Sequence, residues 1–134
     1  MTTIAITENS MNSAANIEYM ETLAMPVPEW VEVCPVADLM VDEGQCALVK
    51  GRQVALFRLS GCDAIYALDN HDPFSEANVI SRGIVGDIQG RVVVASPVYK
   101  QHFELESGRC LEDETVALPR YPVRVVDGRV QIAC

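Results

Sequence analysis

The sequence has no apolar run long enough to cross a membrane. A membrane-spanning helix needs about 20 consecutive apolar residues, whereas apolar stretches such as residues 54–57 and 92–95 have the length of single β-strands. Basic residues are also missing from the beginning of the chain, where a secretory signal or transit peptide would carry them, because the first Lys or Arg is Lys50. We therefore expect a cytoplasmic protein that does not bind a membrane.

Positive charge is scarce and unevenly distributed. The formal net charge is −9. Residues 1–49 hold eight Asp and Glu and no Lys or Arg, whereas residues 50–134 hold eleven acidic residues and ten basic ones. Nucleic acids and anionic membranes are bound by clustered Lys and Arg, so neither is expected as a partner. The acidic N-terminal part either contacts a basic protein surface or keeps the chain soluble.

Cysteine and histidine lack the spacing of a metal site. The five cysteines form no C-x-x-C or C-x-H pair, and the two histidines are His71 and His102. This spacing argues against a zinc ribbon and against an iron–sulfur cluster held by thiolates. We interpret the cysteines as reduced thiols without a catalytic role. They are Cys34, Cys46, Cys62, Cys110 and Cys134.

The sequence does contain a large aliphatic fraction. Apolar residues make up 49% of the 134 residues and aromatic residues only 6%, which excludes wholesale disorder and predicts one core of Val, Ile, Leu and Ala. The first 28 residues differ, because isolated apolar side chains alternate there with Asn, Ser, Thr and Glu up to Pro26 and Pro28. We expect an acidic mobile tail over residues 1–28 and a single domain over residues 29–134.

From Trp30 onward, short apolar or alternating runs are separated by turn residues, as in β-strands joined by tight turns. Asp127-Gly128 suits the positive φ angles of a type I′ hairpin, and Gly51-Arg52 is expected to form another hairpin turn. The pattern predicts an all-β protein, an antiparallel β sandwich or barrel. The expected strands are residues 30–34, 45–50, 54–59, 64–68, 91–95, 102–105, 123–126 and 129–132, with a helical turn at residues 35–40 that carries Leu39 inward.

Two irregular segments interrupt the strands. Residues 69–90 contain a proline and three glycines, and residues 96–101 form a shorter segment. Long loops inside a small domain are uncommon and are usually functional. We therefore expect the chemistry or the partner contacts of the protein in these two loops. Gly83, Gly86 and Gly108 are expected to adopt positive φ angles, and no G-x-G-x-x-G or P-loop spacing predicts a nucleotide site.

The two loops and their flanks resemble a Rieske domain. Residues 66–70, Tyr-Ala-Leu-Asp-Asn, lead into the first loop, and residues 94–99, Val-Ala-Ser-Pro-Val-Tyr, form the second. The resemblance extends over residues 30–132 and implies a Rieske-like fold. A Rieske site holds a [2Fe–2S] cluster with two thiolates and two imidazoles, as C-x-H on the first loop and C-x-x-H on the second. The resemblance places those four positions at Asp72, Phe74, Ser96 and Tyr99.

None of these four residues offers the ligand that the cluster needs. Phe74 has no donor atom, Ser96 lacks a sulfur, and the phenol of Tyr99 is protonated near neutral pH. The resemblance thus implies a Rieske scaffold that has lost its cluster. We expect Phe74 to pack against apolar side chains and Tyr99 to hydrogen-bond Ser96 or Asp72 across the two loops. Asp69 and Asn70 are expected to cap or form a turn through side-chain to backbone hydrogen bonds, with direct contact to a partner as the alternative.

Four blocks of sequence indicate one particular group of Rieske-like proteins. The blocks are residues 69–75, 81–87, 95–101 and 108–111. They are similar to the small subunits of NADH-dependent assimilatory nitrite reductase. This similarity implies a large catalytic subunit that carries FAD, siroheme and a [4Fe–4S] cluster and reduces nitrite to ammonium with NADH or NADPH. It also implies that this chain is a non-catalytic subunit, without a bound cofactor or a catalytic residue of its own.

Polar side chains at or beside the loop tips are candidates for contacts with the large subunit. The resemblance implies this role, because the loop tips of Rieske proteins face the redox partner. The candidates are His71, Arg82, Lys100 and Gln101.

Two other functions remain open from the sequence. A small electron carrier could bind an unorthodox metal through His71, Asp72 and His102, although a metal site needs three or four convergent donors. A hydrolase or isomerase could use Ser96 with a histidine, although no G-x-S-x-G motif surrounds that serine.

Overall fold

The computed structural model describes residues 28–61 and 64–134, and its strands pair antiparallel. The expected all-β class is confirmed, and so is the helical turn, which buries Leu39. In chain order, with η for a 3₁₀ turn, the elements are β1 (Trp30–Pro35), η1 (Val36–Asp38), β2 (Gly44–Val49), β3 (Arg52–Arg58), β4 (Ile65–Asp69), β5 (His71–Asp72), β6 (Ala77–Asn78), η2 (Ile80–Arg82), β7 (Ile84–Ile88), β8 (Arg91–Ala95), β9 (His102–Glu104), β10 (Arg120–Tyr121), β11 (Val123–Val126) and β12 (Arg129–Ala133).

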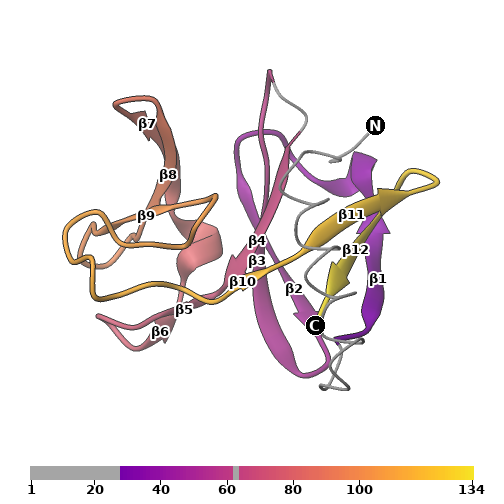
Figure 1. Cartoon of the computed structure of the whole chain (residues 1–134), viewed down its shortest axis with the longest axis horizontal. Coiled ribbons are helices and arrows are strands. Elements are labelled where there is room, and N and C mark those ends of the chain that lie inside the picture. The colour runs from indigo at the N-terminus through magenta and orange to yellow at the C-terminus, as the bar shows by residue number, and fades with distance from the viewer. Residues whose placement is uncertain (1–27, 62–63) are drawn as a thin grey trace, which may run out of the picture.

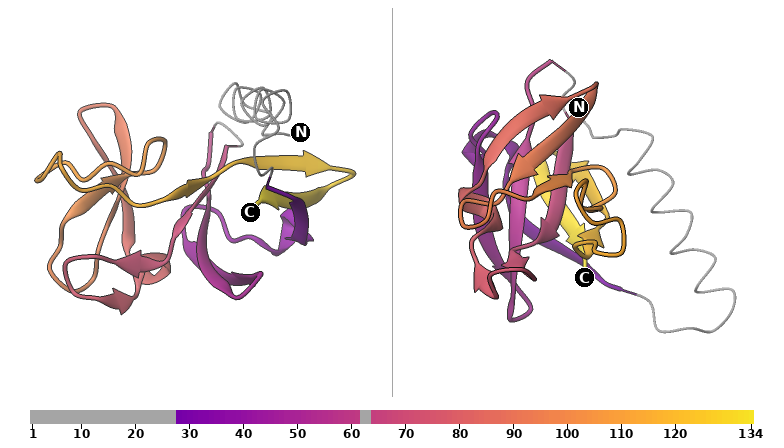
Figure 2. Two further views of the ribbon diagram at one scale, coloured as in Figure 1. Left: turned by 60° about the horizontal axis from the view of Figure 1, so that its bottom comes forward. Right: turned by 90° about the vertical axis from the view of Figure 1, so that its left-hand side faces the viewer.

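The four-stranded sheet β10-β4-β3-β2 lies in the middle of the molecule (Figure 1). The three-stranded sheet β1-β12-β11 lies on one side of it, and we call these two sheets together the barrel lobe. On the other side lie the sheet β7-β8-β9 and the hairpin β5-β6, which with their connections form the loop lobe, residues 70–119 (Figures 1 and 2).

Strand β3 separates two hydrophobic cores. Successive residues of a strand point to opposite faces, and here both faces are buried. Val54 and Leu56 pack into the core of the barrel lobe, whereas Ala55 and Phe57 pack on the opposite face with Phe103 of the loop lobe. The four strand residues are at most 2% exposed. This double burial explains why the β3 sequence is continuously apolar instead of alternating.

The tight turns follow the expected type, with one shift in position. Both residues of Asp127-Gly128 have positive φ angles, 51° and 75°, as a type I′ turn requires. The other expected turn, Gly51-Arg52, is wrong by one residue: the turn is Lys50-Gly51, with φ angles of 50° and 79°. A lysine in the left-handed region is uncommon, so Lys50 could not be recognised as a turn residue from the sequence pattern.

The segment at residues 69–90, expected to be irregular, contains regular structure. It holds β5, β6, η2 and β7, and β7 pairs with β8 along its whole length through the turn Gln89-Gly90. Two of the four side chains of β7, those of Ile84 and Asp87, are exposed, and Gly86 in its middle has none. The strand therefore lacks the apolar alternation by which a strand is recognised in a sequence.

The three glycines that were expected to have positive φ angles lie in three different environments. Gly108 has the expected positive φ angle, 79°, but Gly83 and Gly86 do not. A Cβ atom on Gly83 would lie 2.4 Å from the carbonyl oxygen of Ala95, so this glycine permits the close approach of two backbone segments. Nothing lies within 4 Å of a Cβ added at Gly86. Neither backbone strain nor internal packing therefore accounts for that glycine.

Some expectations fall outside the described residues. The acidic tail, up to residue 27, and Cys62 are among them. In the part of the chain that the structure describes, no helix has the length and apolar character needed to cross a membrane.

Candidate functional site

A hydrogen bond between two buried side chains joins the two loops. Ser96 follows β8, and its hydroxyl donates to Oδ2 of Asp72 on β5 over 2.5 Å. Both residues are 0% exposed. Asp72 is also held from within its own loop: its Oδ1 accepts the backbone N–H of Phe74 and its Oδ2 accepts the hydroxyl of Ser75, each over 2.9 Å. Both carboxylate oxygens are therefore hydrogen-bonded although they are buried.

These hydrogen bonds decide the charge of Asp72. Burial by itself raises the pKa of a carboxyl group, because the charged form loses its hydration. The hydrogen bonds from Ser96, from the N–H of Phe74 and from Ser75 act in the opposite direction, and the pKa of Asp72 lies below its ordinary value. Asp72 is therefore a charged carboxylate at neutral pH whose oxygens are already engaged.

The other two expected ligand positions carry aromatic rings in different surroundings. Phe74 is half-buried, and its ring centroid lies 6.2 Å from that of Phe103 in the core between the lobes. Tyr99, at the tip of the second loop, is 62% exposed. The hydrogen bond expected from Tyr99 across the loops is wrong, because its exposed phenol lies outside the contact that Ser96 and Asp72 make directly.

The four positions do not fit an iron–sulfur cluster. A Rieske cluster needs two thiolates and two imidazoles that converge on the two irons. Here the four positions hold a hydrogen-bonded carboxylate, an apolar ring, a buried hydroxyl that is already donated and an exposed phenol. The two loops meet through a hydrogen bond instead of a shared metal group.

Asn70 was expected to make side-chain to backbone hydrogen bonds in a cap or turn, and sequence reasoning missed its link to the central sheet. Its side chain is buried, and its amide nitrogen donates to Oε1 of Gln53 on β3 over 3.0 Å and to the carbonyl of Asn78 over 3.2 Å. Its Oδ1 accepts the N–H of Ser81 over 2.7 Å. Asn70 thus ties the central sheet to the first loop. Its place directly before that loop was the available signal, since its partners are distant in the sequence.

The four residues expected to contact a partner differ in exposure. His71, Arg82 and Lys100 are exposed, and Nδ1 of His71 lies 3.1 Å from Oδ1 of Asn78. Gln101 is half-buried, and its amide oxygen is buried without a hydrogen-bond partner among the described residues. The amide oxygen of Gln101 is therefore not presented at the surface.

The residues of the alternative metal site do not come together. The carboxylate of Asp72 is occupied by its hydrogen bonds, and Nδ1 of His102 lies 2.6 Å from Oε2 of Glu112. Within residues 28–61 and 64–134, no three His, Cys, Asp or Glu side chains form a group that could hold a metal ion. The use of Ser96 as a nucleophile is also wrong, because its buried hydroxyl donates to Asp72 and not to a histidine.

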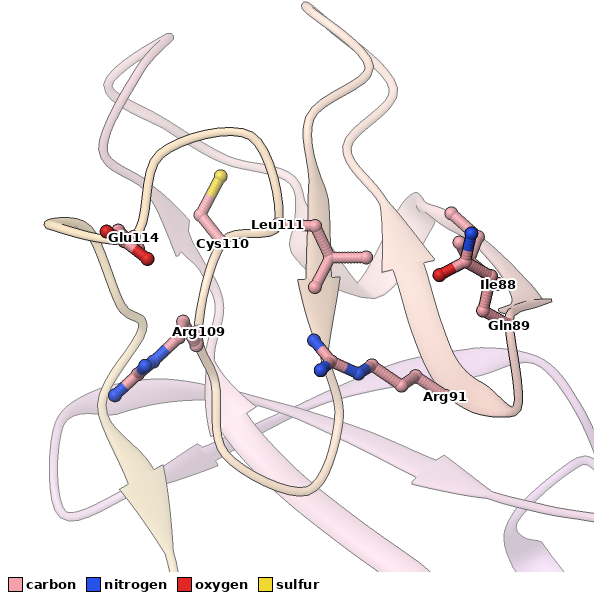
Figure 3. A pocket seen from close by; sticks show the side chains of 7 residues that line it. All are labelled: Ile88, Gln89, Arg91, Arg109, Cys110, Leu111 and Glu114. Carbon is pink, nitrogen blue, oxygen red and sulfur yellow. The ribbon is translucent and has the colours of Figure 1, made fainter.

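A pocket of about 440 Å³ lies in the loop lobe, at the end of β8 opposite Ser96 (Figure 3). Its walls include Arg91, Arg109 and Cys110. In Figure 3 the guanidinium group of Arg109 points away from that of Arg91, so the two do not clamp a single anion. Burial raises the pKa of the Cys110 thiol, which is 1% exposed. The pocket therefore lacks a reactive thiolate as well.

Known proteins are similar to this chain in sequence and in fold. The family model of the Rieske-like [2Fe–2S] domain matches residues 29–133. The nitrite reductase (NADH) small subunit of Salmonella typhimurium is 45% identical over 104 residues, which are 78% of this chain and 96% of that protein. The NMR structure of the Escherichia coli protein NirD is 42% identical, with a TM-score of 0.74 over 81% of this chain and 98% of that one.

A further relative is a much longer protein. The nitrite reductase [NAD(P)H] large subunit of Klebsiella oxytoca is 41% identical over 109 residues, which are 81% of this chain but only 11% of that protein. A region similar to this chain is therefore part of that longer polypeptide. The family match and the identity to the small subunits lead to one assignment. The chain belongs to the Rieske-like [2Fe–2S] domain family and, within it, to the small subunits of NADH-dependent nitrite reductase.

Proposed function

We propose that this chain is the non-catalytic small subunit of an assimilatory NAD(P)H-dependent nitrite reductase. It acts in the cytoplasm with a large subunit that carries FAD, siroheme and a [4Fe–4S] cluster and reduces nitrite to ammonium. The chain supplies neither a cofactor ligand nor a catalytic residue to this reaction. Its contribution is to bind the large subunit and support its activity.

The observation that carries this proposal is the closed contact between the two loops. Asp72 and Ser96 hydrogen-bond each other at positions where a Rieske protein has cysteine ligands, and both are fully buried. A group that is buried and already hydrogen-bonded can coordinate a metal only after that bond is broken. The loops are thus suited to present a fixed surface rather than to transfer electrons.

The large subunit as partner is supported by the Klebsiella oxytoca relative. There, a region similar to this chain belongs to a protein named as a nitrite reductase large subunit. Covalent linkage keeps two domains at a high effective concentration. We infer that the same two units associate without a covalent link when they are separate chains.

The loop tips provide a suitable contact surface. We define the loop-tip surface as His71, Val98, Tyr99 and Lys100. Val98 and Tyr99 are 43% and 62% exposed, and His71 and Lys100 are exposed as well. An exposed aromatic residue with flanking polar groups is typical of protein–protein contacts. Arg82, also exposed, extends the proposed contacts toward β7.

Reconstitution from separately purified subunits tests the proposal. We expect the large subunit to reduce nitrite with NADH or NADPH much faster after this chain is added, and we expect the isolated chain to contain no iron and to show no turnover. Ammonium formation and metal analysis provide the two readouts. A large subunit that is fully active alone, or iron bound in proportion to the isolated chain, would contradict the proposal.

Charge reversal tests the loop-tip surface. Lys100→Glu should weaken binding to the large subunit, because Lys100 lies at the tip of the second loop. Arg109→Glu is the matched control: Arg109 is an exposed cation in the same lobe, but it lies beside the pocket at the opposite end of β8. Equal effects of both variants in a binding titration would indicate a general charge effect and not a contact at the loop tips.

A further inference from the structure

Strand β7 leaves one edge of its sheet open. It is the outer strand in the order β7-β8-β9. The carbonyl of Val92 on β8 accepts the N–H of Leu105 over 3.0 Å, so the backbone polar groups of Val92 face away from β7. Asp87 pairs with Val92 and therefore turns its own N–H and C=O outward. The same alternation turns the polar groups of Val85 outward.

These outward groups are unpaired in the part of the chain that the structure describes. Beyond the pairing of β7 with β8, no backbone hydrogen bond reaches Val85 or Asp87 there. Edge strands usually carry charged side chains, above all Lys, or Pro or a β-bulge that prevents another chain from pairing with them. Strand β7, Ile-Val-Gly-Asp-Ile, has no Lys, Pro or bulge, and Asp87 is its one charged residue. A single acidic residue hinders a second acidic edge but favours a basic segment.

The side chains of β7 also suit the approach of another strand. Ile84 is 73% exposed although it is a large aliphatic residue. Gly86, two residues further along the same face, has no positive φ angle and no close neighbour that would exclude a Cβ atom. A glycine in a strand often marks a place where another backbone comes close. The open space at Gly86 therefore leaves room for another backbone to approach β7 closely.

A groove continues from the beginning of this edge. It has a volume of about 430 Å³ and lies between residues 42–44 and residues 81–85. Met40 and Val41, just before the first wall, are 56% and 44% exposed. The open edge and the exposed aliphatic side chain of Ile84 therefore adjoin the groove, because Ile84 and Val85 belong to both.

We propose that β7 is a docking strand: an extended segment of the large subunit pairs with its outer edge and places side chains in the groove. The inference rests on the proposed function, because it names a second contact with the same partner. Binding of this kind takes its affinity from main-chain hydrogen bonds and its specificity from the neighbouring pockets. For such hydrogen bonds the edge supplies two pairs of unpaired N–H and C=O groups, one on Val85 and one on Asp87.

The charge of the groove indicates which kind of segment it can bind. Asp42, Glu43 and Asp87 are exposed acidic residues along the groove and the edge, against one base, Arg82. A segment that carries Lys or Arg is therefore favoured. A second copy of this chain is disfavoured, because it would bring the same acidic edge and the same net charge of −9.

Amide hydrogen exchange, resolved to single residues, tests the pairing directly. In the free subunit the amides of Val85 and Asp87 should exchange rapidly, because they have no acceptor. In the complex with the large subunit the exchange of these two amides should be about 100-fold slower or more, as for other hydrogen-bonded strand amides. If both amides exchange equally fast in the free subunit and in the complex, the inference is wrong.

A pair of surface variants tests the same edge by affinity. Ile84→Asp should weaken binding to the large subunit about tenfold or more, as expected for a central apolar contact. Leu48→Asp is the control, since Leu48 is also an aliphatic residue on an edge strand and is 74% exposed, against 73% for Ile84. Both side chains lie in solvent in the free subunit, so the fold should tolerate either change.

The outcomes separate this inference from the proposed function. Weaker binding of Ile84→Asp alone supports the docking strand. If Ile84→Asp binds like the wild type while Lys100→Glu binds weakly, the proposed function stands and the docking strand is wrong. If the wild-type chain does not bind the large subunit at all, both proposals are wrong. If Ile84→Asp instead separates a dimer of this chain, the edge joins two copies and the proposed occupant is wrong.

Discussion

The hydrogen bond between Ser96 and Asp72 should hold the two loops together, and Ser96→Ala tests this. The substitution removes one donor from a buried, charged carboxylate. A hydrogen bond to a charged group stabilises a protein by about 1.5–3 kcal/mol. Asp72 keeps the donors from Phe74 and Ser75, so we expect a loss of about 2 kcal/mol. For a domain of about 100 residues this lowers Tm by about 8 °C or more.

The loss should depend on pH in a defined direction. The pKa of Asp72 is lower in the folded protein than its ordinary value of 3.8, so its hydrogen bonds stabilise the fold above that value. This contribution is lost as the pH falls through the folded-state pKa. Removing one donor raises the folded-state pKa of Asp72. The stability difference between the wild type and Ser96→Ala should thus be full at neutral pH and shrink below about pH 4.

Chemical and thermal unfolding, followed by circular dichroism from pH 7 to pH 3, provides the measurement. Ser75→Ala is the matched control: it removes a hydroxyl from the same oxygen of Asp72, but from within the same loop and at a less buried position. We expect a loss of about 1 kcal/mol there. A loss below about 0.5 kcal/mol for Ser96→Ala, or one that does not change with pH, would refute the assignment of this bond as the link between the loops.

Two further predictions concern the loop lobe and the thiols. Gly83→Ala should destabilise the protein by about 1–3 kcal/mol in denaturant unfolding, because its Cβ would meet the carbonyl oxygen of Ala95 at 2.4 Å. Gly86→Ala, with open space at its Cβ, should change stability by less than about 0.5 kcal/mol. In the native protein, alkylation followed by mass spectrometry should modify Cys46 before Cys110: burial raises the pKa of both thiols, but Cys46 is exposed and Cys110 is buried. Equal rates for the two thiols would contradict the burial of Cys110.

The sequence was sufficient for the fold where local chemistry decides the structure. The strand pattern and the Asp127-Gly128 turn predicted the β-class and the last hairpin. The sequence was insufficient where a segment takes its structure from pairing with another segment of the chain. Strand β7 is stabilised by pairing with β8 and not by its own pattern. The turn at Lys50-Gly51 was misplaced because pairing of the flanking strands forces a lysine into the left-handed region.

The candidate site was predicted in part. The loops and the four ligand positions followed from the resemblance, and the structure brings Asp72 and Ser96 into direct contact. The hydrogen bond was assigned to the wrong residue, Tyr99, because a sequence does not show which side chain of a loop is buried. The link from Asn70 to the central sheet was missed for a related reason, since its hydrogen-bond partners lie on β3, on β6 and in η2, far from it in the sequence.

The two cores explain how the loop lobe stays folded when the loops lack cluster ligands. In a metalloprotein the free energy of metal binding contributes to folding. Here Phe74 adds apolar contact with Phe103 on the core that the lobes share, and Asp72 with Ser96 adds a buried charged hydrogen bond. Both contacts fix the buried parts of the loops, while the loop tips and the β7 edge remain exposed. A scaffold with fixed loops and open edges is the arrangement that binding to a large partner requires, because little conformational entropy is then lost on association.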